Sequence, residues 1–205
     1  MLRLGVLGGT FDPIHRGHLA VARAALASGS LDRVLLVPSG VPPHKSGVTT
    51  PGEQRLEMVR LATRAESQLL ACDLETSREG VSYTVDTLAK IRQQHPGAEI
   101  SFLIGEDSIA ELPGWRDFRR ILRLAHILTF PRVGSSHRFV PETFPGVPPE
   151  VLRKCQENRI DMDPVPVASR DIRRAIAHGL PFDADVTAPV AEYIRKNQLY
   201  GYQEN

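Results

Sequence analysis

Gly8-Gly9-Thr10-Phe11-Asp12-Pro13-Ile14-His15-Arg16-Gly17-His18 is the stretch that decides the fold, because of what lies on either side of it. The apolar residues 2–7 precede it and are typical of a buried strand, whereas residues 19–26 follow it and favour a helix. The order is therefore strand, glycine turn, helix. In an open parallel sheet, this junction directs free backbone N–H groups and the positive end of a helix at an anion, most often a phosphate.

The residue types within this turn suit a phosphate. Gly8 and Gly9 let the backbone lie against the anion, and Thr10 can add a hydroxyl donor. His15 and His18 are three residues apart, so both rings can lie on one side of the first helical turn and reach the same ligand. The alternative is an ordinary tight turn followed by two surface histidines. So many of these residue types in one short stretch favour the phosphate site.

The composition is that of an ordinary globular protein. The 205 residues, of which 41% are hydrophobic and 24% charged, suffice for one α/β domain. Because 25 basic and 24 acidic residues leave a net charge of +1, a dedicated nucleic-acid surface is not expected, and a small anionic substrate fits better. A homo-oligomer is compatible with the sequence but not indicated by it.

Cysteine usage and hydropathy predict a cytoplasmic protein. Cys72 and Cys155 are far apart and have no metal-type spacing, which favours two plain thiols. The first residues run straight into a strand, without a charged leader or a cleavage site. No apolar run approaches the roughly 20 residues that a membrane span needs, so no membrane partner is expected.

Strand and helix patterns alternate along the chain, which is typical of a parallel sheet covered on both faces. Strands are predicted at residues 2–7, 34–37, 69–73, 100–104, 126–130 and 160–167. The last is predicted as an edge strand because Pro164 and Pro166 interrupt it. Helices are predicted at 19–26, 52–64, 85–91, 118–122 and 149–158, after the N-cap Ser169, and from about residue 187.

These elements predict an α/β fold, a Rossmann-like doubly wound parallel sheet. Residues 1–205 are expected to form a single domain, with a small helical C-terminal part at about 168–205. The stretch 131–149 is rich in Pro, Gly and Ser, so we interpret it as a long surface loop.

Ligands of a doubly wound sheet collect at the carboxyl ends of the strands, so polar residues in these loops are candidates. His44 and Lys45 follow the second strand, where a lysine on a restrained loop can contact a triphosphate. The alternative is a polar loop stiffened by prolines. Asp107 follows the fourth strand and is either a ribose ligand or a charge at a helix N-terminus.

Two further features favour a nucleotide. Arg173 and Arg174 lie near the start of a predicted helix, where positive charge is unfavourable unless an anion is nearby. Trp115, the only tryptophan, follows Pro113 and Gly114 and is either a core residue or a flat ring that stacks on a heterocycle.

Two other catalytic chemistries lack support in the sequence. Ser101 and Ser108 have no visible base arrangement, which argues against nucleophilic triad chemistry. No carboxylates have metal-ligand spacing, so we expect no metal site in the protein. Mg²⁺ is instead expected to be carried by the phosphates of a nucleotide substrate.

Several motifs together resemble one enzyme family. Residues 8–18 closely resemble the signature of the nucleotidyltransferase superfamily marked by Thr/His-x-Gly-His, and within it the bacterial nicotinate mononucleotide adenylyltransferases. The resemblance covers roughly residues 4–200. The further matches, in the family's order, are Pro38-x-x-x-Pro42-Pro43-His44-Lys45, Ser82-Tyr83-Thr84, Ile104-Gly105-x-Asp107-Ser108 and Trp115.

One motif departs from the family. The family commonly ends with Ile-Ser-Ser-Thr-x-Ile-Arg, whereas this chain has Val167-Ala168-Ser169-Arg170-Asp171-Ile172-Arg173. Arg170 replaces a threonine, so the expected hydroxyl contact with the ATP phosphates is missing, although a guanidinium can serve the same anion from further away.

The resemblance also implies roles for individual residues. The implied catalytic residues are His15, His18 and Lys45. Those implied to bind ATP are Gly8, Gly9, Phe11, Gly17, Gly105, Asp107, Ser169, Arg170 and Arg173. Those implied to bind the nicotinate nucleotide are Thr10, His44, Tyr83, Thr84, Trp115 and Arg132.

By this resemblance, the activity is transfer of AMP from ATP to nicotinate mononucleotide, which gives deamido-NAD and pyrophosphate. The sequence leaves nicotinamide mononucleotide or phosphopantetheine open as acceptors, because backbone groups can bind an acid or an amide. A nucleotide-binding regulator without catalysis is a further alternative. A tRNA-charging enzyme also uses a His-x-Gly-His turn, but this chain has neither a second lysine-bearing signature loop nor an anticodon-sized domain.

Overall fold

A parallel sheet forms the centre of the protein. The computed structural model describes residues 1–40, 50–134, 144 and 146–203. Within these ranges, five strands pair in the order β3-β2-β1-β4-β5, every neighbouring pair parallel. Their bounds are β1 Arg3–Gly9, β2 Arg33–Pro38, β3 Leu69–Ala71, β4 Glu99–Gly105 and β5 His126–Phe130. The predicted Rossmann-like doubly wound sheet is confirmed.

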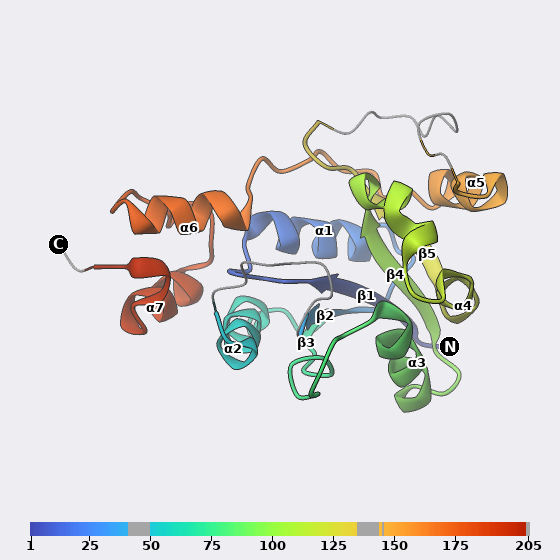
Figure 1. Ribbon diagram of the computed structural model, residues 1–205, viewed down its shortest axis with the longest axis horizontal. Helices are drawn as coiled ribbons and strands as arrows, with labels where there is room; N and C mark the ends of the chain where they lie inside the picture. The colour runs from blue at the N-terminus through green and yellow to red at the C-terminus, as the bar shows by residue number, and fades with distance from the viewer. Residues whose placement is uncertain (41–49, 135–143, 145, 204–205) are drawn as a thin grey trace.

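Helices connect the strands and cover the sheet (Figure 1). The first four are α1 Arg16–Ala27, α2 Gly52–Thr63, α3 Thr84–Gln94 and the 3₁₀ helix η1 Glu106–Gly114. They are followed by α4 Phe118–Leu124, α5 Pro149–Glu157, α6 Ser169–Ala177, α7 Ala188–Lys196 and the 3₁₀ turn η3 Leu199–Gly201. No helix of the described residues is long and apolar enough to cross a membrane.

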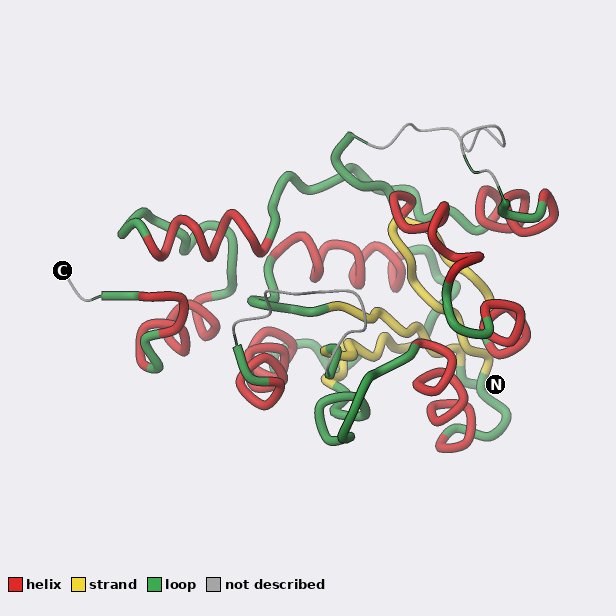
Figure 2. Tube along the Cα trace, in the orientation of Figure 1, coloured by secondary structure: helices red, strands yellow, loops and turns green. Residues whose placement is uncertain are grey.

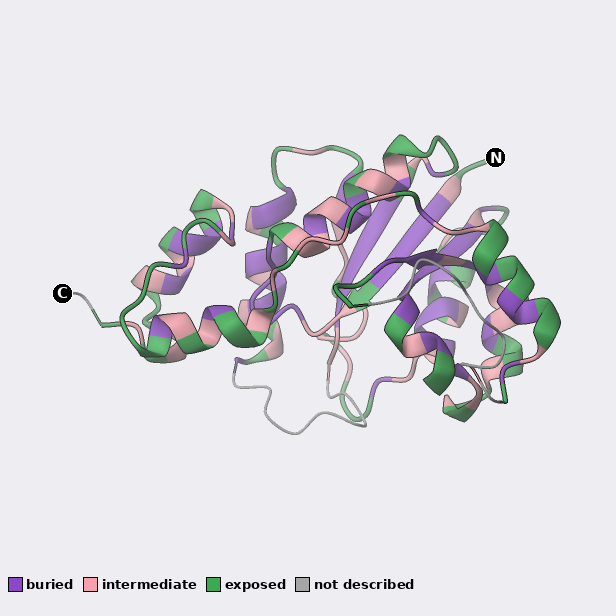
Figure 3. Cartoon of the chain, turned by 90° about the horizontal axis from the view of Figure 1, so that it is seen from above, coloured by how far each residue is buried: buried purple, intermediate pink, exposed green. Residues whose placement is uncertain are grey.

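Side chains that point alternately to the two faces of the sheet divide the core into two layers. In β1, Leu4 and Val6 belong to the cluster that contains α3, whereas Leu7 belongs to the cluster that contains α1. Successive side chains of a strand point to opposite faces, so near-continuous apolar strands serve both layers. Figure 3 shows the strands as buried and the outer faces of the helices as exposed. About 25 cal/mol per Å² of apolar surface removed from water stabilises this arrangement.

The predicted edge strand at 160–167 is wrong. Residues 161–168 have no regular structure, and Figure 2 draws the stretch between α5 and α6 as loop. Pairing with β5 is limited to one bridge between Thr129 and Arg159, in which the Thr129 N–H donates to the Asn158 carbonyl and the Ile160 N–H donates to the Thr129 carbonyl. Pro164 and Pro166 have no N–H to donate, so the ladder cannot continue.

The predicted N-cap at Ser169 is also wrong. Ala168 occupies the N-cap position of α6, and Ser169 is the first helical residue. The Ser169 hydroxyl donates to the Pro13 carbonyl instead, at 2.9 Å. A long-range contact with the phosphate turn has therefore taken the place of a local cap. Of the predicted surface loop at 131–149, residues 135–143 and 145 lie outside the described residues.

Candidate active site

A large cavity lies at the carboxyl ends of the strands. It has a volume of about 1340 Å³ and is lined by residues that follow β1, β2, β4 and β5. The chain runs outward from β1 to β3 and then returns to β4, so the strand order reverses between β1 and β4. Ligands of doubly wound sheets bind in the crevice at such a reversal.

All the predicted site residues that the structure describes line this cavity. From the turn after β1 these are Gly8, Gly9, Thr10, Phe11, His15, Gly17 and His18. From later parts of the chain they are Tyr83, Thr84, Gly105, Asp107, Trp115, Arg132, Ser169, Arg170 and Arg173. His44 and Lys45 lie outside the described residues. Residues spread over most of the chain therefore meet in one place, as the motif order predicts.

The two histidines of the turn cap helix α1 together. His15 is the N-cap, and its Nδ1 accepts from the Gly17 N–H at 3.1 Å. The His18 Nδ1 accepts from the His15 N–H at 3.3 Å, which completes a reciprocal capping box. The rings are stacked, with centroids 3.6 Å apart. Because each Nδ1 is an acceptor, each neutral ring carries its proton on Nε2, where it can donate to a ligand.

The environment of His15 keeps it neutral. The residue is 4% exposed, and burial, helped by the positive charge of Arg132, lowers its pKa from the ordinary 6.5 to about 4. Protonation at Nδ1 would also break the cap to Gly17. At neutral pH, His15 is therefore a hydrogen-bond donor rather than a cation.

Side chains behind the turn hold its carbonyl groups. Arg55 of α2 donates to the Thr10 carbonyl at 2.7 Å, Arg173 of α6 donates to the Asp12 carbonyl at 2.7 Å, and Ser169 donates to the Pro13 carbonyl. A carbonyl oxygen repels an anion, whereas an N–H group attracts one. Fixing three carbonyl groups of the turn by hydrogen bonds to other elements therefore suits it to phosphate.

The Asp12 carboxylate, which is 2% exposed, is bound from the C-terminal part of the chain. The Tyr200 hydroxyl donates to Asp12 Oδ1 at 2.8 Å. Burial, together with the nearby Asp12 charge, raises the pKa of Tyr200, so the phenol keeps the proton that it donates. This bond fastens η3 to the turn.

Two glycines of the site have no room for a side chain. A Cβ on Gly17 would lie 3.0 Å from Cε1 of the His15 ring, so the ring would have to shift. A Cβ on Gly105 would meet Asp107 Oδ1 and lie 2.9 Å from the Arg132 Nε. These glycines allow the histidine pair and the Asp107–Arg132 pair their positions.

The far side of the cavity is aromatic and charged. Trp115 packs its edge against Phe102, with centroids 6.0 Å apart, and lines the cavity between η1 and α4. The Arg116 guanidinium lies 4.5 Å from the centre of the Tyr83 ring. Flat rings of this kind can stack on a heterocycle.

The charged residues at the mouth differ in how firmly they are held. Asp107 lies 3.7 Å from Arg132, and both side chains are about half exposed. Arg170, which replaces the family threonine, is 83% exposed and lies 3.6 Å from Asp171. Arg170 is thus at the rim, whereas Arg173 is held against the turn.

Arg55 and Tyr200, which hold the turn from outside the cavity, were not predicted. Arg55 is 2% exposed, although it is charged. Its position relative to Met58, Val59 and Ala62 follows the helical spacing of an apolar face, and this pattern could have identified it. Tyr200 gave no comparable signal, because its partner Asp12 is 188 residues away in the chain.

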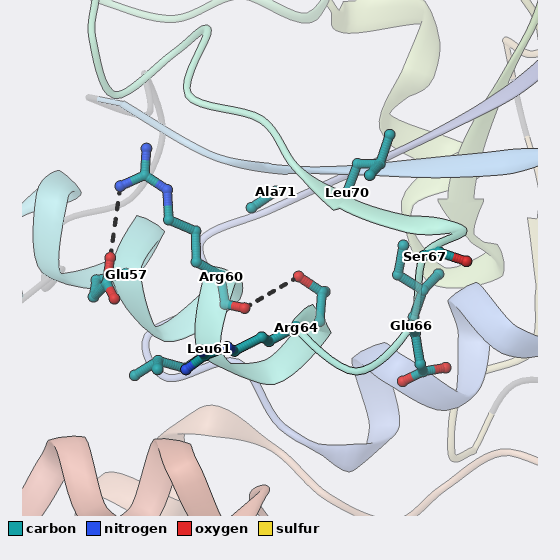
Figure 4. A pocket seen from close by; sticks show the side chains of 10 residues that line it. Glu57, Arg60, Leu61, Arg64, Glu66, Ser67, Leu70 and Ala71 are labelled. Carbon is teal, nitrogen blue, oxygen red and sulfur yellow. Dashed lines mark hydrogen bonds and ion pairs between the residues drawn. The ribbon is translucent and has the colours of Figure 1, made fainter.

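A second, smaller hollow lies beside α2 and β3 and contains none of the predicted site residues. Its volume is about 490 Å³ (Figure 4). Glu57 and Arg60 pair across one helical turn at 3.6 Å, and both are largely in solvent. Exposed pairs of this kind bind little, so we assign no ligand to this hollow.

No group of three or more His, Cys, Asp or Glu residues within the described ranges could hold a metal ion. Both cysteines are free thiols, as predicted. The cavity is lined by backbone groups, imidazoles, arginines, aromatic rings and single carboxylates such as that of Asp107.

Comparison with known proteins agrees with this geometry. The family model described as cytidylyltransferase-like matches residues 6–175. A protein of Symbiobacterium thermophilum named "Probable nicotinate-nucleotide adenylyltransferase" is 38% identical over 205 residues, which cover 98% of this chain and 96% of the relative. A protein of the same name from Thermomicrobium roseum is 40% identical over 204 residues, with 98% and 92% covered.

A solved structure shares the fold. The nicotinic acid mononucleotide adenylyltransferase of Plasmodium falciparum, solved with NaAD, superposes with a TM-score of 0.75 at 20% identity and covers 99% of each chain. The chain therefore belongs to the cytidylyltransferase-like family and, within it, to the nicotinate-nucleotide adenylyltransferases.

Proposed function

We propose that this enzyme transfers AMP from ATP to nicotinate mononucleotide. An oxygen of the acceptor 5′-phosphate forms a bond with the α-phosphorus of ATP. The bond from that phosphorus to the bridging oxygen of the β-phosphate breaks, and pyrophosphate leaves. The products are nicotinate adenine dinucleotide and pyrophosphate. The names of the relatives support this choice of substrates.

The observation that carries the proposal is the histidine pair. His15 and His18 are stacked at the start of α1, each with Nδ1 engaged by a backbone N–H. Their Nε2–H groups can therefore donate hydrogen bonds to the α- and β-phosphate oxygens as negative charge builds there. Donors that are fixed before the reaction stabilise this charge without reorganisation, and removal of one typically costs about 10²–10³ in turnover.

Positioning supplies the rest of the catalysis. Phosphoryl displacement needs no covalent group of the enzyme, so holding the two nucleotides in line is the main task. We propose that Asp107 lies by the adenosine, and that Arg173 and Ser169 face the ATP phosphates. Thr84, Trp115 and Arg132 would then hold the nicotinate nucleotide, with the indole on its ring. Lys45 remains a prediction for the triphosphate, and His44 remains one for the nicotinate nucleotide.

Magnesium enters this scheme with the substrate. The described residues offer no carboxylate cluster for a resident ion, whereas ATP phosphates bind Mg²⁺ directly. The reaction therefore starts from the Mg²⁺–ATP complex. We also place it in the cytosol, which the two free thiols support.

An acceptor comparison tests the proposal. ATP and Mg²⁺ are mixed with nicotinate mononucleotide, nicotinamide mononucleotide or phosphopantetheine in parallel, and pyrophosphate release is followed. We expect the highest kcat/KM with nicotinate mononucleotide. Preference for either other acceptor would correct the substrate, and inactivity with all three would favour a nucleotide-binding regulator.

A further inference from the structure

Arg55 is a buried cation that binds backbone carbonyl groups from three separate segments. Its NH1 donates to the Thr10 carbonyl at 2.7 Å, its Nε to the Thr50 carbonyl at 3.0 Å, and its NH2 to the Gly40 carbonyl at 3.3 Å. The residue is 2% exposed. Among the ion pairs of the described residues, none involves Arg55.

Burying such a charge is costly, so it calls for an explanation. Desolvation lowers the pKa of the Arg55 guanidinium, and the nearby Asp12 carboxylate is the largest influence in the opposite direction. An apolar side chain on this face of α2 would serve the core at a lower cost. The planar guanidinium, however, carries five N–H donors in fixed directions, which an apolar residue or a lysine cannot imitate.

The three carbonyl groups belong to segments that meet at the site. Thr10 lies in the phosphate turn and lines the cavity. Gly40 follows β2, and Thr50 precedes α2, so the two bound the stretch whose sequence contains His44 and Lys45. The backbone at Gly40 also packs against the Glu75 carbonyl oxygen, with which a Cβ on Gly40 would collide.

We propose that Arg55 is a positioning residue that fixes the Thr10 turn relative to Gly40 and Thr50. It touches no reacting atom and acts through the backbone that it holds. The inference rests on the proposed function, because the position of the turn matters for turnover only if the turn holds the transferring phosphates. A misplacement of about 1 Å can cost about 10²-fold in rate.

The test compares Arg55→Lys with wild type in the pyrophosphate assay. Lysine keeps a buried cation but cannot reach three carbonyl groups in one plane. We expect kcat to fall about 10- to 100-fold, while KM for ATP changes less than about threefold, because ground-state contacts in the rest of the cavity remain. Wild-type kcat in Arg55→Lys would overturn the inference.

Chemical rescue separates positioning from a general loss of stability. Arg55→Ala leaves a space of guanidinium shape, so methylguanidinium at millimolar concentration is expected to restore part of kcat, whereas sodium at equal ionic strength is not. Arg3→Ala is the matched control, because Arg3 also donates to a backbone carbonyl, that of Gly29, but lies at the opposite end of β1. Its kcat should equal that of wild type, with or without methylguanidinium.

The outcomes distinguish the two proposals. Wild-type enzyme that is inactive with every acceptor would refute the proposed function. An active wild type, with Arg55→Lys losing kcat only in proportion to its folded fraction in a thermal scan, would refute the role of Arg55 alone. If Arg55→Ala does not fold, the role of Arg55 is judged from Arg55→Lys alone, by comparing its loss of kcat with its folded fraction.

Discussion

At the scale of single residues, the catalytic role that we propose for the His18 Nε2–H group can be tested by substitution. We expect His18→Ala to lower kcat by about 10²–10³, because a donor to the developing charge is lost. Folding should change little, since loss of a capping acceptor costs only about 1 kcal/mol. Pyrophosphate release at saturating substrates, with a thermal scan in parallel, measures both effects.

Two amide variants provide the control for His18. Asparagine places an oxygen near Nδ1 and so keeps the cap to the His15 N–H, but it has no group at the position of Nε2. Glutamine reaches the position of Nε2 with an N–H group. His18→Gln should therefore retain more activity than His18→Asn. Near-normal turnover in His18→Asn would contradict the assigned role.

The neutral state of His15 has a measurable pH dependence. Its folded pKa of about 4 lies below the ordinary 6.5, so the folded protein binds fewer protons than the unfolded chain between these values. The stability that comes from keeping His15 neutral is fully present above pH 6.5 and is lost as the pH falls to 4. The shift between these two pKa values corresponds to about 3 kcal/mol in the free energy of unfolding.

NMR titration of the His15 ring, together with urea unfolding at pH 7 and pH 4, tests this expectation. His15→Asn is the control, because it cannot titrate and should lose less stability than wild type over the same range. A midpoint near 6.5 for His15 would contradict the buried, neutral state.

The residues of the turn could be predicted from the sequence, because their spacing within one helical turn is local. Of the side chains behind the turn, Ser169 and Arg173 were predicted through the family motif, but not their bonds to the turn carbonyl groups. Arg55 was missed, although its place on the apolar face of α2 is a local signal. Tyr200 and Asp12 are brought together only by the packing of the whole chain. Local periodicity carries no information on such a contact.

At the scale of elements, η3 and α6 are bound to the turn by polar contacts, and the contact of η3 can be tested by removing the Tyr200 hydroxyl alone. We expect Tyr200→Phe to lower the free energy of unfolding by about 1–3 kcal/mol, because the buried Asp12 carboxylate loses a donor. Thermal or urea unfolding measures the change.

Tyr193→Phe is the matched control for Tyr200→Phe. Tyr193 lies on α7 and is partly buried, as is Tyr200, but its hydroxyl takes part in none of the hydrogen bonds found among the described residues. Tyr193→Phe should leave the free energy of unfolding near that of wild type. Equal stability of Tyr200→Phe and wild type would show that the bond to Asp12 contributes nothing measurable.

Most strands and helices follow from the sequence, because apolar runs and helical spacing are local and strong here. The structure of residues 160–167 does not follow from the sequence in this way, because their apolar residues resemble a strand while the prolines prevent pairing. Met162 and residues 164–167 line the cavity instead. The apolar residues of this stretch therefore face the site and are not part of the sheet.

At the scale of the whole molecule, the cavity lies where most elements converge, so an occupant should stabilise the fold as a unit. A ligand at 100 times its Kd adds about 2.7 kcal/mol. For a chain of this size, that corresponds to a rise in Tm of about 5–10 °C. We expect this rise with nicotinate adenine dinucleotide in a thermal scan, and no rise with free nicotinamide at the same concentration.

The contact between Asp12 and Tyr200 also has a meaning for synthesis of the protein. A ribosome makes the turn and both histidines before the side chains of α6 and η3 that hold the turn, which lie more than 150 residues later in the chain. A nascent chain that ends before residue 169 contains the signature of the enzyme without Ser169, Arg173 and Tyr200 to brace it. The turn is therefore held by all three of these side chains only after residue 200 has been synthesised.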